Sequence, residues 1–92
     1  MPVPETIKAL VGCDVVVDTD SHLMYLGKLT ETSSDSITLA DVDVHSNHDT
    51  HSSREMYLMD ARKYGVRQNR TCTVILLSRI VSVSKLDDVT DY

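Results

Sequence analysis

Hydrophobic and polar residues alternate along most of this chain, and short polar stretches interrupt the alternation. The alternating segments are rich in β-branched residues, a composition typical of strands. The pattern predicts five strands, at residues 13–18, 22–31, 36–44 and, after a division at Ser78-Arg79, in the two halves of 71–86. Residues 19–21 and 32–35 are polar and are expected to form turns. Five short, strongly bent antiparallel strands favour a small closed barrel.

The third predicted strand changes phase halfway along. Ile37 and Leu39 lie on one side of an alternating strand, whereas Val42 and Val44 lie on the other. A bulge or sharp bend near residues 40 and 41 would turn both pairs into the core. Gly27, inside the second strand, is another position where a bend or bulge is expected.

A short helix is expected before the first strand, over residues 5–11. Pro4 fits the first turn of a helix, and Gly12 would end it. An apolar stripe would face the sheet, made of Ile7, Leu10 and Val11.

A second helix is expected over residues 53–64, inside a long insertion (residues 45–70) between the third and fourth strands. Ser52 and Glu55 have the spacing of a capping box, and Gly65 suits a helix end. Tyr57, Ala61 and Tyr64 would share one face, although residues 56–59 also fit a strand.

Size and composition narrow the class of protein. Ninety-two residues, 41% hydrophobic and without Trp or Phe, form one domain with a thin core that an oligomer would help to bury. No apolar run reaches the length of a membrane span, about 18 residues, and no secretory signal is visible. Cys13 and Cys72 are expected to be small buried strand residues, and no nucleophile motif or Gly-rich loop is present. We therefore expect a cytoplasmic, non-catalytic protein without a cofactor.

Charge is divided unevenly along the chain. Residues 1–53 hold two lysines against nine acids, whereas residues 54–85 hold seven cations against two acids. The net charge of −5 argues against a generic nucleic-acid coat, yet the second half can form a positive face. The cations of this half can equally pair with the acids of the first.

Several segments together resemble the Sm-like (Sm/LSm) family. Leu10-x-Gly12-x-x-Val15-x-Val17 resembles that family's passage from an N-terminal helix into the first strand, and Tyr25-x-Gly27-x-Leu29 resembles its second strand. Asp35-x-Ile37-Thr38-Leu39 resembles the end of its first motif, and residues 74–83 resemble its second motif. The resemblance implies a five-stranded, SH3-like barrel with an N-terminal helix and, in this chain, a helical insertion. It also implies rings of six or seven subunits in which the fourth strand of one copy pairs with the fifth strand of the next.

The resemblance also implies binding of single-stranded RNA, with departures at the site. In the family an Asn before the closing apolar residue of the first motif binds a base edge, and an Arg-Gly turn joins the last two strands. Here Thr38 replaces the Asn, and Leu77-Ser78 followed by Arg79 replaces the turn. The RNA-binding candidates at family positions are therefore Asp35, Thr38, Ser78 and Arg79. Thr38 can instead be an ordinary strand residue, and Arg79 can simply close the turn.

Three further possibilities concern the insertion. A basic segment suits RNA binding but also suits a solvated helix end. Its cations are Arg62, Lys63, Arg67 and Arg70, with Tyr64, Gln68 and Asn69 among them. A ring without RNA could use residues 45–70 to hold a protein partner. His45, His48 and His51 could bind zinc or nickel, or could be a polar loop that is rich in His by chance.

Overall fold

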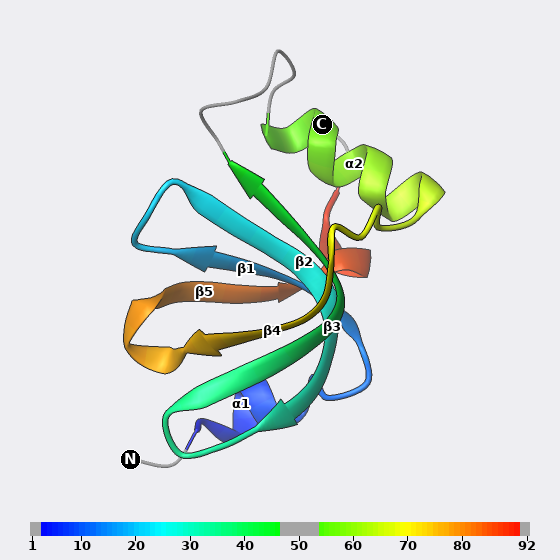
Figure 1. Ribbon diagram of the computed structural model, residues 1–92. Helices are drawn as coiled ribbons and strands as arrows, with labels where there is room; N and C mark the ends of the chain where they lie inside the picture. The colour runs from blue at the N-terminus through cyan, green and yellow to red at the C-terminus, as the bar shows by residue number, and fades with distance from the viewer. Residues whose placement is uncertain (1–2, 47–53, 91–92) are drawn as a thin grey trace.

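Five antiparallel strands form one strongly curled sheet in a computed structural model that describes residues 3–46 and 54–90 (Figure 1). The strand order across the sheet is β4-β3-β2-β1-β5. The strands are β1 (Asp14–Thr19), β2 (Leu23–Thr32), β3 (Ser36–Ser46), β4 (Arg70–Leu76) and β5 (Ile80–Lys85). Helix α1 (Glu5–Lys8) precedes the sheet, and helix α2 (Arg54–Tyr64) lies between β3 and β4. Two 3-10 turns, η1 (Leu77–Arg79) and η2 (Leu86–Asp88), flank β5.

The sheet is open, so the predicted closed barrel is wrong. In the described part of the chain β4 pairs only with β3, and β5 pairs only with β1. The turn η1 joins the two strands but does not begin a hairpin ladder between them. Its backbone bonds elsewhere, because the Leu77 N–H donates to the Asp35 carbonyl (2.9 Å) and the Arg79 carbonyl accepts from the Asp20 N–H (3.0 Å). The division of residues 71–86 near Ser78-Arg79 is confirmed.

A bulge in β3 produces the phase change expected there. The β2–β3 register shifts between Leu26 and Lys28, and Asp41 on the opposite strand has φ 54°. Because of this bulge, Ile37, Leu39 and Val42 are all buried although their parity differs. Gly27 lies opposite the bulge, where an added Cβ would meet the Ala40 carbonyl oxygen at 3.0 Å.

A second bulge lies in β5, at one edge of the sheet. Asp18 pairs with Ser82 and Thr19 pairs with Ile80, so Val81 is left without a partner on β1. Ile80 and Val83 consequently both pack on the core, whereas Val81 is 70% exposed.

The sheet has a hydrophobic core on each face. Strand β1 supplies both cores, because Val15 and Val17 point to one face and Val16 to the other. The first core lies inside the curl and contains Val3, Val15, Val17, Leu29, Ile37, Leu39, Val42 and Ile75. The second core joins the opposite face to α2 and η2 and contains Val16, Met24, Leu26, Leu58, Ala61 and Leu86. Helix α2 is thus part of the folded domain and not a detached appendage.

Several local predictions need correction. Helix α1 ends at Lys8, and a turn leaves Val11 of its expected apolar stripe 47% exposed. Strand β3 runs to Ser46, so His45 belongs to a strand and not to a loop. Cys72 is exposed because the even-numbered residues of β4 point away from the first core, whereas Cys13 is half-buried. Tyr64 is 80% exposed, so the inner face of α2 is made by Leu58 and Ala61. The predicted helix start at residue 53 and its cap Ser52 lie outside the described residues.

Within residues 3–46 and 54–90, no helix has the length and apolar character that crossing a membrane requires.

Candidate functional site

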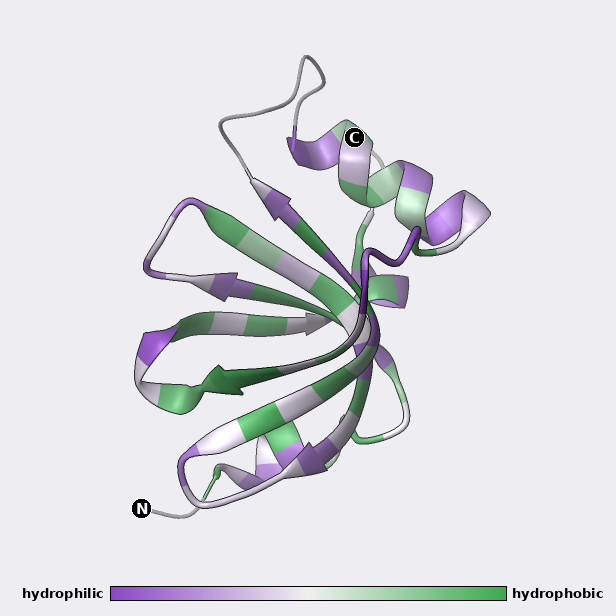
Figure 2. Cartoon of the chain, in the orientation of Figure 1, coloured by the Kyte–Doolittle hydropathy of each residue, from purple (hydrophilic) through white to green (hydrophobic). Residues whose placement is uncertain are grey.

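The two outer strands of the sheet carry exposed hydrophobic side chains. Val74 and Leu76 on β4 are 60% and 54% exposed, and Val81 on β5 is 70% exposed. Figure 2 shows hydrophobic residues along both strands. Each strand also has a backbone edge that pairs with no other strand in the described part of the chain. Such edges are templates for pairing with a further strand.

A groove of about 900 Å³ follows the β5 edge. Ile7 of α1 and Leu10 of the turn after it form one wall, and the other wall comes from η1 and β5. The lining includes Leu76, Leu77, Ser78, Ile80, Val81 and Val83. The edge of β5 is therefore accessible along a largely apolar channel.

The structure brings Asp35 and Ser78 to the same end of the sheet, where both line this groove. Asp35 is held by its own turn, because the Ser33 hydroxyl donates to the Asp35 carboxylate at 3.1 Å. Thr38 lies apart from them in the body of β3, paired with Glu31 on one side and Val74 on the other. The prediction that Thr38 lies in a strand is confirmed, and the residues beside Thr38 are its pairing partners on β2 and β4.

Arg79 lies on the β1–β2 side of η1. Its guanidinium Nε is 3.3 Å from the Asp20 carboxylate, and both side chains are largely exposed. An exposed pair of this kind is worth about 0–1 kcal/mol, so it orients Arg79 without removing it from solvent. A small pocket of about 250 Å³ joins Arg79 to Asp20, Tyr25 and Leu76.

The other four basic candidates lie at the far end of the molecule, where α2 ends and β4 begins (Figure 1). All four side chains are exposed. Arg62 donates to the carbonyl of Val89, and Arg70 donates to the carbonyl of Asn69. Lys63 and Arg67 have no hydrogen-bond or ion-pair partner among the described residues. The RNA-binding candidates thus do not form one surface.

Asn69 fixes this end to β3. Its side-chain amide donates to the Val44 carbonyl (3.1 Å) and to the Asp43 carboxylate (3.0 Å), and its amide oxygen accepts from the Val44 N–H (3.0 Å). The Asn69 backbone N–H donates to the Val42 carbonyl at 2.8 Å. Asn69 is therefore committed to the sheet, although the sequence alone suggested it for an RNA surface.

Tyr57 connects α2 to the same carboxylate. Its hydroxyl donates to Asp43, and its ring stacks on His45 with centroids 3.8 Å apart. Burial of Tyr57 raises the pKa of its hydroxyl well above the usual range, and the Asp43 carboxylate raises it further. The protonated hydroxyl thus stays available as a hydrogen-bond donor that positions α2.

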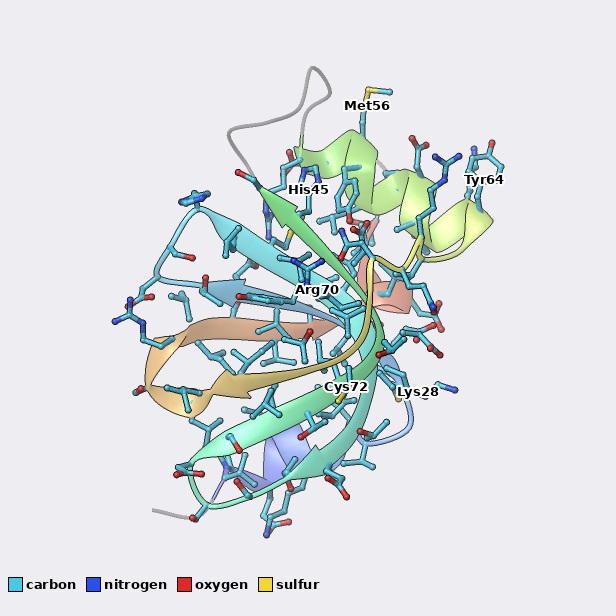
Figure 3. All side chains as sticks on the ribbon, in the orientation of Figure 1. Lys28, His45, Met56, Tyr64, Arg70 and Cys72 are labelled. Carbon is cyan, nitrogen blue, oxygen red and sulfur yellow. The ribbon has the colours of Figure 1, made fainter. Side chains whose placement is uncertain are left out.

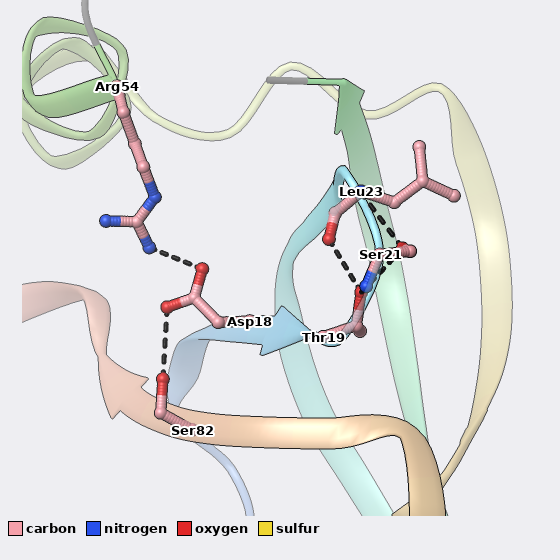
Figure 4. Close-up of polar contacts among 6 residues, drawn as sticks. All are labelled: Asp18, Thr19, Ser21, Leu23, Arg54 and Ser82. Carbon is pink, nitrogen blue, oxygen red and sulfur yellow. Dashed lines mark hydrogen bonds and ion pairs between the residues drawn. The ribbon is translucent and has the colours of Figure 1, made fainter. Parts of the chain in front are cut away.

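Asp18 anchors the beginning of α2 (Figure 4). Arg54 donates to one oxygen of the Asp18 carboxylate, and the Ser82 hydroxyl donates to the other at 3.0 Å. One carboxylate therefore connects β1, β5 and α2. Asp18 therefore has a structural partner on each carboxylate oxygen.

The histidines do not form a metal centre in the described part of the chain. No group of three His, Cys, Asp or Glu there could hold a metal ion. His45 stacks on Tyr57, and its Nε2 atom is buried without a hydrogen-bond partner. His48 and His51 lie outside the described residues. The prediction of a three-His site is therefore untested.

Comparison with known proteins adds no assignment. No protein-family model matches the chain, and no curated protein matches its sequence.

Proposed function

We propose that this protein is a non-catalytic, Sm-like subunit that assembles through its outer strands into a ring of six or seven copies. In this proposal β4 of one copy pairs with β5 of the next. The observation that carries it is the pair of free strand edges with exposed Val74, Leu76 and Val81. The β5 groove offers space for the neighbouring strand and its side chains.

Physical considerations favour such an arrangement. An unpaired edge with exposed hydrophobic residues invites uncontrolled association unless another strand covers it. A chain of this length also buries only about 60% of its unfolded surface when it folds alone. Pairing β4 with β5 covers both edges of every subunit once the ring closes.

Two edge variants test the proposal by sedimentation velocity and native mass spectrometry. The wild type should form a closed oligomer, whereas Val74→Lys and Val81→Lys should each be monomeric because one edge of each is blocked. Val11→Lys is the matched control, since Val11 is an exposed hydrophobic residue that belongs to neither outer strand.

A mixture of the two edge variants makes the test specific. Val74→Lys keeps an intact β5 edge and Val81→Lys keeps an intact β4 edge, so the mixture should yield heterodimers and nothing larger. A wild type that stays monomeric at the highest soluble concentration would refute assembly. Self-association of Val81→Lys alone would point to β4–β4 pairing and contradict the ring.

Single-stranded RNA is the ligand that we propose for the assembled protein. The observation in its favour is the exposed basic segment at the end of α2. It includes Arg67, which has no partner among the described residues, and Tyr64, which is 80% exposed. Cations near phosphates and aromatic rings on bases are the usual means of holding a single strand. Arg79 at η1 is the candidate on the other end of the molecule.

Fluorescence anisotropy with oligo-U and oligo-A, at low and near-physiological salt, tests the RNA proposal. Binding should weaken with salt, and Arg67→Ala/Arg70→Ala should lower the salt slope by about 0.7 for each phosphate that the variant no longer neutralises. Arg79→Ala tests the opposite end, and Lys28→Ala is a control for the removal of one exposed charge. No binding of either oligonucleotide at low salt would favour a ring that serves as a protein scaffold.

A further inference from the structure

Another cavity, distinct from the β5 groove and from the pocket at Arg79, lies at the C-terminal end of α2. It measures about 540 Å³, within the range of about 300–1,000 Å³ common for small-ligand sites. Its lining comes from β3, α2 and the segment that follows the helix: Asp43, Tyr57, Asp60, Ala61, Tyr64, Gly65 and Arg67. A single copy of the chain builds this cavity completely.

The polar groups in the inner part of the cavity contact one another. The Asp43 carboxylate accepts from the Tyr57 hydroxyl and from the Asn69 amide, so both of its oxygens have partners. One face of the Tyr57 ring is covered by His45. These residues shape the inner wall of the cavity.

The rim of the cavity has the opposite character. Asp60 and Tyr64 are four residues apart on α2 and therefore lie on the same side of the helix. Gly65, with φ +95°, ends the helix and lets the chain turn so that Arg67 also reaches the cavity. Among the described residues, neither Asp60 nor Arg67 has a hydrogen-bond or ion-pair partner. Figure 3 shows Tyr64 projecting outward at the end of α2.

We propose that this cavity binds a guanine nucleotide of single-stranded RNA. Tyr64 provides a stacking surface for the base, Asp60 accepts hydrogen bonds from the base, and Arg67 contacts a phosphate. This inference rests on the proposed RNA binding and is independent of ring assembly.

The chemistry of the rim distinguishes guanine from the other bases. The Watson–Crick edge of guanine presents two adjacent donors, N1–H and the 2-amino group, which one carboxylate can accept together. Adenine and cytosine have a ring acceptor beside their amino group, and uracil has a carbonyl on each side of its single N–H. Each of these bases would therefore bring an acceptor lone pair close to the Asp60 carboxylate, which is repulsive.

Anisotropy with uridine oligonucleotides that carry one central guanosine, inosine or adenosine tests the proposal. Guanosine should bind about tenfold more tightly than adenosine or uridine, because a bidentate contact discriminates by at least that order. Inosine lacks the 2-amino group and should fall between them. Asp60→Asn should abolish the preference, so that the guanosine, adenosine and plain uridine oligonucleotides bind this variant with equal affinity.

Control variants separate the base contact from general binding. Glu55→Gln neutralises another exposed acid of α2 and should keep the guanosine preference. Tyr64→Ala should weaken binding of every oligonucleotide, since stacking does not depend on the base. Equal affinity for all four oligonucleotides, or a preference that survives Asp60→Asn, would overturn the guanine site while RNA binding stands. Failure of every oligonucleotide to bind would overturn both.

Discussion

Individual residues at the bulge of β3 show how closely the two longest strands approach each other. An added Cβ at Gly27 would lie 3.0 Å from the Ala40 carbonyl oxygen and 3.2 Å from Cγ2 of Val42. The first contact is with backbone, which cannot rotate out of the way. Only glycine therefore lets β2 pass the bulge without displacement of β3.

Gly27→Ala should consequently destabilise the fold. We expect a loss of about 1–3 kcal/mol in the free energy of unfolding, as for other overpacked cores. Urea denaturation followed by circular dichroism measures it. Lys28→Ala, at the next and exposed position, should change stability by less than about 0.5 kcal/mol. Equal stability of Gly27→Ala and the wild type would contradict the close approach.

Tyr57 gives the protein a specific response to alkaline pH. The folded state raises the pKa of Tyr57 above the ordinary value of 10.0. A raised pKa means that the stabilising contribution is complete below about pH 10 and is lost as the pH rises further, because only the unfolded chain then ionises readily.

Tyr57→Phe should remove this response. At neutral pH we expect it to cost about 1–2 kcal/mol through removal of the hydrogen bond to Asp43. The stability difference from the wild type should shrink as the pH rises above about 10, which urea titrations at a series of pH values can follow. A difference that grows with pH would refute the assignment.

At the level of elements, α2 depends on burial more than on its own helical tendency. Leu58 is 6% exposed and packs in the second core, on the face of the sheet opposite the first core. Leu58→Ala should lower the free energy of unfolding by about 2–4 kcal/mol. Hydrogen exchange should show loss of protection first in α2, whereas the exposed control Lys63→Ala should leave protection unchanged. Uniform loss of protection across sheet and helix would argue against a separate second core.

The elements also show where sequence reasoning succeeds and fails. The strands and the bulge in β3 were predictable because alternating, β-branched residues indicate which positions are buried. The helix before β4 was predictable from its end signals. Closure of the sheet was not predictable from the sequence. Whether β4 and β5 pair depends on the backbone hydrogen bonds that η1 makes with Asp35 and Asp20. Burial of Cys72 was mispredicted because apolar character does not tell which face of an outer strand looks outward.

The candidate sites were less predictable than the fold. The sequence pointed to the basic residues of 62–70. It could not show that Asn69 hydrogen-bonds to β3, or that Asp60 and Arg67 line the same cavity. These relations depend on the turn at Gly65 and on the docking of α2. The Ser52–Glu55 and Gly65 signals located the helix but contain no information about its neighbours.

For the whole molecule, the asymmetry of the sheet decides what kind of assembly can form. The two outer strands are different, so pairing one with the other is a heterologous contact that repeats from copy to copy. Such contacts close into a ring only when the rotation between copies is right, and otherwise they extend into filaments. The proposed ring thus requires a fixed rotation between neighbouring copies.

Assembly should make thermal stability depend on protein concentration. If β4 and β5 pair only between folded copies, the Tm of the wild type should rise with concentration by mass action. The Tm of Val81→Lys should be lower and independent of concentration, whereas Val11→Lys should behave like the wild type. Differential scanning calorimetry over a wide concentration range measures both. A concentration-independent Tm for the wild type would contradict assembly through these strands.

The pairing of β1 with β5 has a consequence for the order of events during synthesis. Val15 pairs across the sheet with Lys85, although most of the chain separates them. Strand β1 therefore remains without one of its neighbours until residues 80–85 have left the ribosome, and contacts between such distant segments form slowly. Until then the valines of β1 are accessible to chaperones and to other nascent chains. The last strand to be made is the one that ends this exposure.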